Sequence, residues 1–392
     1  MIMTIIAATI AALMIFLTPS QGSALSTNTI TVIMLAISSI LFLVGAFIRT
    51  MTWASLQKVE QNLTPRVIEF FQKDKYLQTS TLVIFAFPII SVFLTYAIND
   101  LNFGRPIFWF ALWSLLLGIA LDTTLQLIDR STNYLNPFSV VNYISKHTTF
   151  SDDKSVFNSI DSLSEISTKA VNQTLPSLSV TSIENLQKIC KNYLLNAKAA
   201  SSNPEIVSYT LFYLYDKLEY LFDKALESHT EPVCDKLITT MGKFAVYTAS
   251  YDITLACFPI HFLGRFAKKA QKANMDNVSE KGTCTLLEVG KIFVKDIDLQ
   301  YLDIKELFFS INQHMEEIAK ANFQKNKKTN IAILSQPFHD LKDVFKHEKV
   351  ATHTDTPIIV KDIERIINQF EQLELIMNKI PSVEIPEEED KS

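Results

Sequence analysis

The chain has 392 residues, of which 48% are hydrophobic, and its formal net charge is −5. Seven basic and six acidic residues lie within the first 130 positions, whereas the rest of the chain carries 29 basic and 35 acidic residues. An acidic excess repels nucleic acid, so we expect no nucleic-acid partner. The eight glycines form no dinucleotide-binding or Walker-type loop, and no catalytic or metal-ligating pattern is recognisable. We therefore expect neither an enzyme nor a bound cofactor.

Four apolar segments fill the first 127 residues, over about residues 3–18, 30–48, 81–98 and 107–127. A bilayer core about 30 Å thick needs about 20 helical residues. The second and fourth segments meet that length, and the first and third are near its lower limit. We predict an all-α protein with a four-helix transmembrane bundle over residues 1–130. A soluble helical domain over 131–385 and an acidic, disordered tail over 386–392 should follow.

The distribution of basic residues predicts the orientation of these spans. The connection Arg49–Ser80 carries five Lys or Arg residues, whereas the two shorter connections carry at most one. This connection is therefore predicted to be cytoplasmic, together with the N-terminus and the soluble domain. The apolar residues of this connection follow a helical pattern that Pro65 interrupts. The helix is expected either to lie along the inner membrane surface or to dock on the soluble domain. Gly22-Ser23-Ala24 also resembles a signal-peptidase site, but the absence of a basic residue in Met1–Thr4 favours a retained span.

Three residues of the fourth segment, Ser114, Gly118 and Asp122, are spaced to share one helical face. They form a candidate intramembrane polar site, because an acid within a span is costly and often marks function. In the alternative that we favour, Asp122 lies near the cytoplasmic head groups, about 24 Å from the external end, and only ends the span. Pro88, in the middle of the third segment, predicts a helix kink.

The remainder reads as amphipathic helices separated by short breaks. The run Leu175–Val180 is expected to be a break, with a new helix capped at Thr181 or Ser182, and Asn203-Pro204 should open the next. Tyrosines that follow are assigned to core or domain packing: Tyr209, Tyr213, Tyr215 and Tyr220. Gly264 and Gly290 occupy similar pentapeptides 26 residues apart, which predicts stacked helix–turn units.

One further stripe of apolar residues follows a strict heptad pattern, starting at Thr356-Pro357 and ending before Pro381. Its members are Ile359, Ile363, Ile366, Phe370, Leu373, Met377 and Ile380. The stripe predicts either a coiled coil with a second copy of the chain or packing within the chain's own helices. We favour packing within the chain, because three heptads make a marginal isolated dimer.

Cysteines and histidines give no functional pattern. The four cysteines are Cys190, Cys234, Cys257 and Cys284. They suit two disulfides or, as we favour, buried free thiols in a reducing compartment.

The spacings of His339, His347 and His353 do not place them on one helical face. We expect surface roles for these histidines rather than a metal site.

The stretch from Asp161 to Leu186 includes Ala170-Val171-Asn172 and then Leu175-Pro176. This stretch resembles the segment that follows the spans in uncharacterised bacterial membrane proteins with four N-terminal spans, a basic loop after the second and a helical soluble tail. The resemblance implies a bacterial inner-membrane location and carries over no catalytic residues.

These observations favour a non-enzymatic membrane scaffold or subunit of a membrane complex. The spans would lie in the lipid bilayer, and the cytoplasmic helical domain would bind a protein partner or another copy of the chain. The alternative is a small transporter or channel that uses Asp122 and the Pro88 kink.

Overall fold

We describe the fold from a computed structural model of the chain. The structure describes residues 3–9, 27–62, 75–99, 106–201, 203–297, 299, 302–326 and 330–379, and no strand occurs in these ranges. The chain divides into two compact units, Met1–Ile144 and Ser145–Ser392. The fold is therefore all-α in its described parts, as the sequence predicts. The predicted acidic tail over 386–392 lies outside these residues.

Three long helices form most of the first unit: α2 (Thr27–Asn62), α4 (Lys75–Asn99) and α5 (Pro106–Leu135). Within them Asn28–Ala54, Lys75–Ile98 and Phe108–Asn133 are long and apolar enough to cross a membrane. Most of the first predicted span falls outside the described residues, where only 3–9 are seen, and these are helical. The described residues thus supply three candidate spans, which correspond to the second, third and fourth predicted spans, and the predicted four-span bundle is not confirmed. It also extends α2 to Asn62, so the first part of the basic connection continues the helix.

The three helices pack on one another around a shared apolar core. Met34 of α2, Phe87 of α4 and Trp113 of α5 are buried there, and the rings of Phe87 and Trp113 lie 5.9 Å apart. Gly45 allows α2 to approach α4, since a Cβ at that position would collide with Ile84. Many other large apolar side chains of these helices point outward, among them Leu43, Phe93 and Phe108. Such a surface suits lipid as its solvent rather than water.

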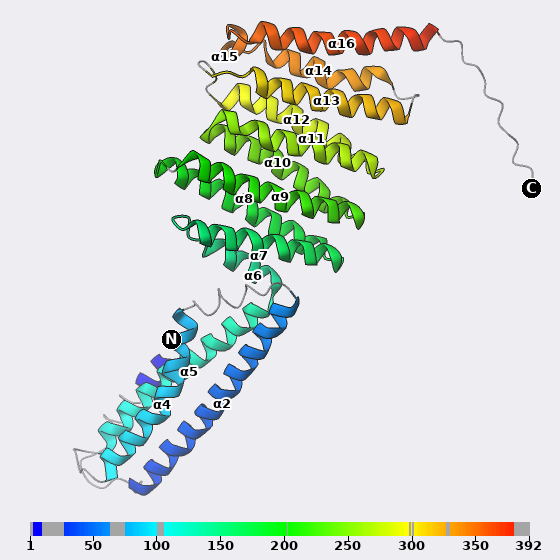
Figure 1. The fold of residues 1–392 in the computed structure, drawn as a ribbon. Helices are drawn as coiled ribbons and strands as arrows, with labels where there is room; N and C mark the ends of the chain where they lie inside the picture. The colour runs from blue at the N-terminus through cyan, green and yellow to red at the C-terminus, as the bar shows by residue number, and fades with distance from the viewer. Residues whose placement is uncertain are drawn as a thin grey trace, which may run out of the picture. The chain divides into compact units, whose positions relative to one another are not determined.

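The short helix α6 (Pro137–Lys146) follows, and the second unit is then a series of helical hairpins. Its helices are α7 (Asp153–Asn172), α8 (Pro176–Ala199), α9 (Pro204–Glu227), α10 (Glu231–Tyr251), η1 (Ile253–Ala256), α11 (Cys257–Lys272), α12 (Asp276–Asp296), α13 (Lys305–Lys325), α14 (Ile331–Val344), α15 (Glu348–Ala351) and α16 (Thr356–Lys379). Figure 1 shows these helices stacked one after another from α7 to α16.

The helices of the stack form two layers. In one layer α7, α9, α11, α13 and α16 each touch the next, and in the other α8, α10, α12 and α14 do so. Helices of the first layer begin at residues 153, 204, 257, 305 and 356, so the unit recurs roughly every 50 residues. The predicted stacking of helical units is confirmed, but the 26-residue period is wrong. Gly264 and Gly290 lie on α11 and α12, the two helices of one hairpin.

The turns within three hairpins share one geometry. Thr174, His229 and Asn274 have positive φ angles of 57°, 49° and 60°. The next residue in each turn donates its backbone N–H to the carbonyl of an alanine five positions earlier, at 2.8, 2.8 and 2.9 Å. This is the Schellman arrangement that ends many helices, usually with glycine at the positive-φ position. The chain forms it three times without glycine, so its low glycine content does not prevent tight turns.

Two predicted helix starts have different outcomes. Asn203 accepts a hydrogen bond from the backbone N–H of Glu205 at 3.0 Å, and α9 begins at Pro204 as predicted. The predicted break at Leu175–Val180 is wrong, because α8 begins at Pro176 and runs through Thr181 and Ser182. Proline is compatible with the first helical turn, since the N–H groups there have no partner within the helix. Pro176 therefore starts the helix rather than interrupting it.

The predicted heptad stripe lies on α16. Ile359, Ile363, Ile366 and Phe370 are buried within the chain, and the ring of Phe370 stacks on that of Phe338 from α14 at 5.9 Å. Leu373 and Met377 are only partly buried, and Ile380 lies outside the described residues. Packing on α13 and α14 therefore accounts for the first half of the stripe.

All four cysteines are free thiols. Cys190 and Cys234 are buried, whereas Cys257 is partly buried and Cys284 is exposed. The expectation of buried thiols therefore fails at Cys284, which lies on the outward side of α12. This difference supplies the second unit with both an accessible and a protected natural thiol.

Candidate functional site

Asp122 lies on α5 and is bound to the helical segment at residues 3–9. Its Oδ1 accepts the backbone N–H of Met3 at 3.1 Å, and its Oδ2 accepts the backbone N–H of Thr4 at 2.9 Å. The hydroxyl of Thr4 donates to the same Oδ2. The first N–H groups of a helix have no partner within the helix and favour a negative charge. The carboxylate therefore caps the N-terminal segment from a position 118 residues later in the chain.

Gly118 brings the same two segments together one turn away. A Cβ at Gly118 would lie 2.5 Å from the Cβ of Ala7 and 3.0 Å from the carbonyl oxygen of Met3. Since Thr4 lies at Asp122 and Ala7 lies at Gly118, the N-terminal segment runs antiparallel to α5. Ser114, the third predicted site residue, is partly buried one turn further along α5. The predicted polar face is therefore a helix–helix contact with one charged residue.

Pro88 does not end α4, which continues on both sides of it as one helix. Ser91, three residues later, donates its hydroxyl to the carbonyl of Phe87 at 2.9 Å and accepts the indole N–H of Trp113 at 2.9 Å. The polar groups near the proline are thus used in joining α4 to α5. No group able to hold a metal ion occurs within the described residues.

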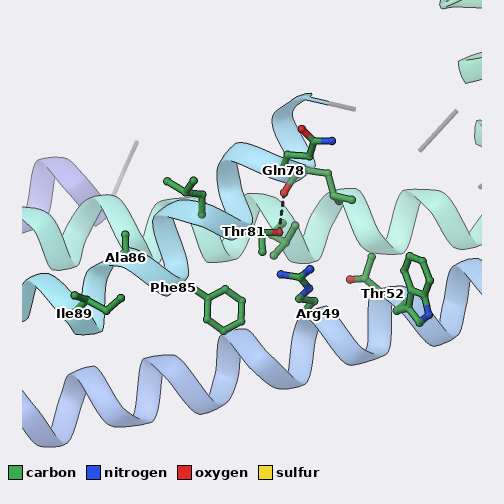
Figure 2. Close-up of a pocket in the computed structure, with 11 residues that line it drawn as sticks. Arg49, Thr52, Gln78, Thr81, Phe85, Ala86 and Ile89 are labelled. Carbon is green, nitrogen blue, oxygen red and sulfur yellow. Dashed lines mark hydrogen bonds between the residues drawn. The ribbon is translucent and has the colours of Figure 1, made fainter. Parts of the chain in front are cut away.

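A cavity of about 880 Å³ lies between α2 and α4, with Leu127 of α5 at its wall. Its polar lining is Arg49, Thr52, Gln78 and Thr81, and its apolar lining includes Trp53, Leu82, Phe85, Ala86 and Ile89. Figure 2 shows Arg49 and Thr52 on α2 facing Thr81 and Phe85 on α4. The sequence does not reveal this cavity, since its lining comes from three helices that carry no motif.

Along α4 the polar lining lies near the start of the helix, where Leu77 also lines the cavity, and the lining from Leu82 to Ile89 is apolar. Gln78 and Thr81 lie near the start of the candidate span Lys75–Ile98, and Ile89 lies about 16 Å further along the helix axis. The guanidinium carbon of Arg49 is 5.8 Å from the centre of the Phe85 ring. Within the part of the chain that the structure describes, no carboxylate pairs with Arg49. The cavity therefore places a cation beside Phe85, from which the apolar lining of α4 continues to Ile89.

In the second unit a pair of histidines joins α11 to α13. Nδ1 of His261 lies 2.9 Å from Nε2 of His314, and His314 is buried against Gly264. Nδ1 of His314 lies 3.6 Å from a carboxylate oxygen of Glu317, which is too long for a hydrogen bond. Burial, together with the neighbouring charges of Lys268 and His261, lowers the pKa of His314 to about 4. Burial also lowers the pKa of His261.

This pair predicts loss of stability in mild acid. In the unfolded chain the pKa of a histidine is about 6.5, so between pH 6.5 and 4 the unfolded state binds more protons than the folded state. We expect about 2 kcal/mol of stability to be lost between pH 7.5 and 5, measured by thermal unfolding with circular dichroism in mild detergent. His314→Phe should remove most of this dependence, whereas His339→Phe, at an exposed position, should keep it. An unchanged pH profile in His314→Phe would assign the dependence to other groups.

His353 corrects the prediction that the later histidines have surface roles. It is buried, and its Nε2 lies 3.1 Å from the carbonyl oxygen of Leu302. Its Nδ1 accepts the backbone N–H of Asp355 at 3.1 Å. These contacts tie the turn before α16 to the segment before α13. The His353 side chain can be buried because both of its ring nitrogens contact backbone groups. The sequence spacing of the histidines does not reveal such contacts.

The tyrosines of α9 divide between core and surface. Tyr215 is buried and its hydroxyl lies 3.1 Å from that of Thr248, whereas Tyr209 and Tyr220 are 64% and 55% exposed. The ring of Phe157 from α7 contacts Tyr209 and Tyr213 edge to face, at 5.8 and 5.1 Å. We call Phe157, Tyr209, Tyr213 and Tyr220 the aromatic face. The sequence predicts core or domain packing for all four tyrosines. Tyr215 lies in the core, Tyr209 contacts Phe157 of α7 but is largely exposed, and Tyr220 is exposed.

Comparison with known proteins assigns no family. No family model matches the chain, and no curated protein matches it. Among solved structures, a "Circular tandem repeat protein with novel repeat topology and enhanced subunit contact surfaces" aligns over 91% of this chain and 100% of its own, with 12% sequence identity and a TM-score of 0.28. That score is too low to indicate a common fold.

Proposed function

We propose that the protein is a membrane-anchored scaffold without enzymatic activity, whose stacked hairpins bind a protein partner in the cytoplasm. The observation that carries the proposal is the aromatic face on α7 and α9. Tyrosine is enriched among the residues that dominate binding energy at protein interfaces. Tyr209 already contacts the Phe157 ring, so it would lose little conformational entropy on binding. The three candidate spans would hold this surface at the bacterial inner membrane.

The alternative, a small transporter or channel using Asp122 and the Pro88 kink, has less support. Both carboxylate oxygens of Asp122 accept hydrogen bonds from the N-terminal segment. A group that exchanges protons or ions needs access to a water-filled path, whereas these contacts close the carboxylate against a helix end. Near Pro88, Ser91 is likewise joined to Trp113.

The partner is tested by changing the aromatic face. Tyr209→Ser with Tyr220→Ser should weaken binding at least tenfold, since each removes a large exposed ring from the interface. The measurement is the native mass of the detergent-solubilised full chain, followed by reconstitution with the identified partner. Leu195→Ser removes an equally exposed apolar side chain from α8, 57% exposed, and should leave binding unchanged. A lone homo-oligomer with a water-filled central path would favour transport instead.

The orientation is tested with natural thiols. Cys284 is exposed and Cys190 is buried, so a membrane-impermeant maleimide should label the native second unit mainly at Cys284. We expect labelling only after the cells are permeabilised, and loss of labelling in Cys284→Ser. A cysteine introduced at Ser23, in the connection predicted to be external, should be labelled in intact cells. Labelling of Cys284 in intact cells would reverse the predicted orientation.

A further inference from the structure

The cavity between α2 and α4 has the chemistry of a phospholipid site. We propose that it binds one anionic glycerophospholipid from the surrounding bilayer, with the phosphate at Arg49 and an acyl chain along Phe85, Ala86 and Ile89. The proposal requires the membrane-spanning unit but does not depend on the scaffold function or on the aromatic face.

The position of Arg49 within a candidate span favours binding of an anion beside its guanidinium group. Arg49 lies within the candidate span Asn28–Ala54, five residues before its end. A guanidinium at this depth is costly to remove from water unless an anion and hydrogen-bond acceptors surround it. The Phe85 ring supplies a cation–π contact, and no carboxylate among the described residues supplies the countercharge. A phosphate diester carries the single negative charge that the described residues of this site lack, and the planar guanidinium can bind two of its oxygens.

The polar neighbours complete a site for a head group. Thr52, Gln78 and Thr81 line the same end of the cavity as Arg49. The hydroxyls of Thr52 and Thr81 donate to the carbonyls of Ile48 and Leu77, so their oxygens suit the hydroxyl groups of a glycerol head group. The Gln78 amide is the side chain of the three whose N–H groups suit a phosphate oxygen. Basic pockets between transmembrane helices on the cytoplasmic side are a recurrent form of lipid head-group site. The basic connection predicts that this end of the bundle is the cytoplasmic one.

The apolar part of the cavity suits an acyl chain and excludes a soluble anion as the main ligand. Beyond Thr81 the lining becomes Leu82, Phe85, Ala86 and Ile89. Leu82 and Ile89 are 68% and 60% exposed, so the cavity is open at the side of the bundle rather than enclosed. A lipid can therefore enter laterally from the bilayer with its chain in the apolar part. A free phosphate at Arg49 would leave the apolar lining from Leu82 to Ile89 without a ligand to cover it.

The test is native mass spectrometry of the full chain in detergent, titrated with phosphatidylglycerol or phosphatidylcholine. We expect one saturable phosphatidylglycerol adduct, bound about fivefold more tightly than phosphatidylcholine, since one Arg near the surface contributes about that factor. Arg49→Gln should abolish this preference, and Arg49→Lys should retain part of it. Arg130→Gln is the matched control, because Arg130 lies at the same end of the bundle but over the Tyr76 ring, outside the cavity lining. It should keep the full preference.

A second variant and a competitor separate the remaining explanations. Ala86→Phe should fill the apolar part and weaken both lipids at least fivefold without changing any charge. Glycerol phosphate at millimolar concentration should fail to displace the lipid. An unchanged preference in Arg49→Gln, unchanged binding in Ala86→Phe, or complete displacement by glycerol phosphate would each overturn the proposal.

Discussion

Ile366→Lys should lower the stability of the second unit by about 4 kcal/mol, because it places an ammonium group in a fully buried apolar position. Ile366 lies on the inner face of α16, which packs on α13 and α14. For a unit of this size the loss corresponds to a fall in melting temperature of about 10 °C. The buried thiol of Cys234 reports the transition, since its reaction with a thiol reagent requires the second unit to open.

The matched control is Ile376→Lys, which introduces the same charge at a position on α16 that is 58% exposed. It should change stability by about 0.5 kcal/mol or less. Because Ile359, Ile363 and Ile366 are buried within one chain, the melting temperature of the unmodified protein should not depend on its concentration. A melting temperature that rises with concentration would show instead that two copies pair through this helix.

Asp122→Leu should release the N-terminal helical segment from α5. The substitution leaves the backbone N–H groups of Met3 and Thr4 without their acceptor. Asp122 lies within the candidate span Phe108–Asn133, and in the apolar part of a bilayer no water would replace the lost acceptor. We expect a loss of about 3 kcal/mol and at least tenfold faster amide exchange over residues 3–9, measured by mass spectrometry. Thr123→Leu is the control, because the Thr123 hydroxyl donates only within α5, to the carbonyl of Ile119. Its exchange should match that of the unmodified protein.

Asp122→Asn separates a structural role from transport. The amide keeps one acceptor oxygen for these N–H groups, so the fold should be retained with a loss of about 1 kcal/mol. Proton flux into liposomes containing the variant should equal that of the unmodified protein. Loss of a measurable flux in a variant that still folds would place the transporter function first.

The sequence alone predicted the properties that depend on neighbouring residues. Hydropathy over about 20 residues located the candidate spans in α2, α4 and α5, and apolar periodicity predicted helices throughout the second unit. Asn203-Pro204 and Thr356-Pro357 marked the starts of α9 and α16 correctly. These signals are local, because hydrogen bonding and capping in a helix involve residues within one turn of each other. The predicted break at Pro176 is wrong because a proline is compatible both with a break between helices and with the first turn of a helix.

Tertiary structure alone decided which helical faces meet. Asp122 meets Thr4 across 118 positions, His261 meets His314 across 53, and the hairpins recur roughly every 50 residues. Helical periodicity shows that a face is apolar but does not identify the helix that covers it. Because periodicity does not identify the covering helix, it does not predict that Tyr215 is buried while Tyr209 is exposed. For the same reason it does not predict the cavity beside Arg49. Partner choice between helices depends on side-chain packing summed over many distant contacts, which no short stretch of sequence contains.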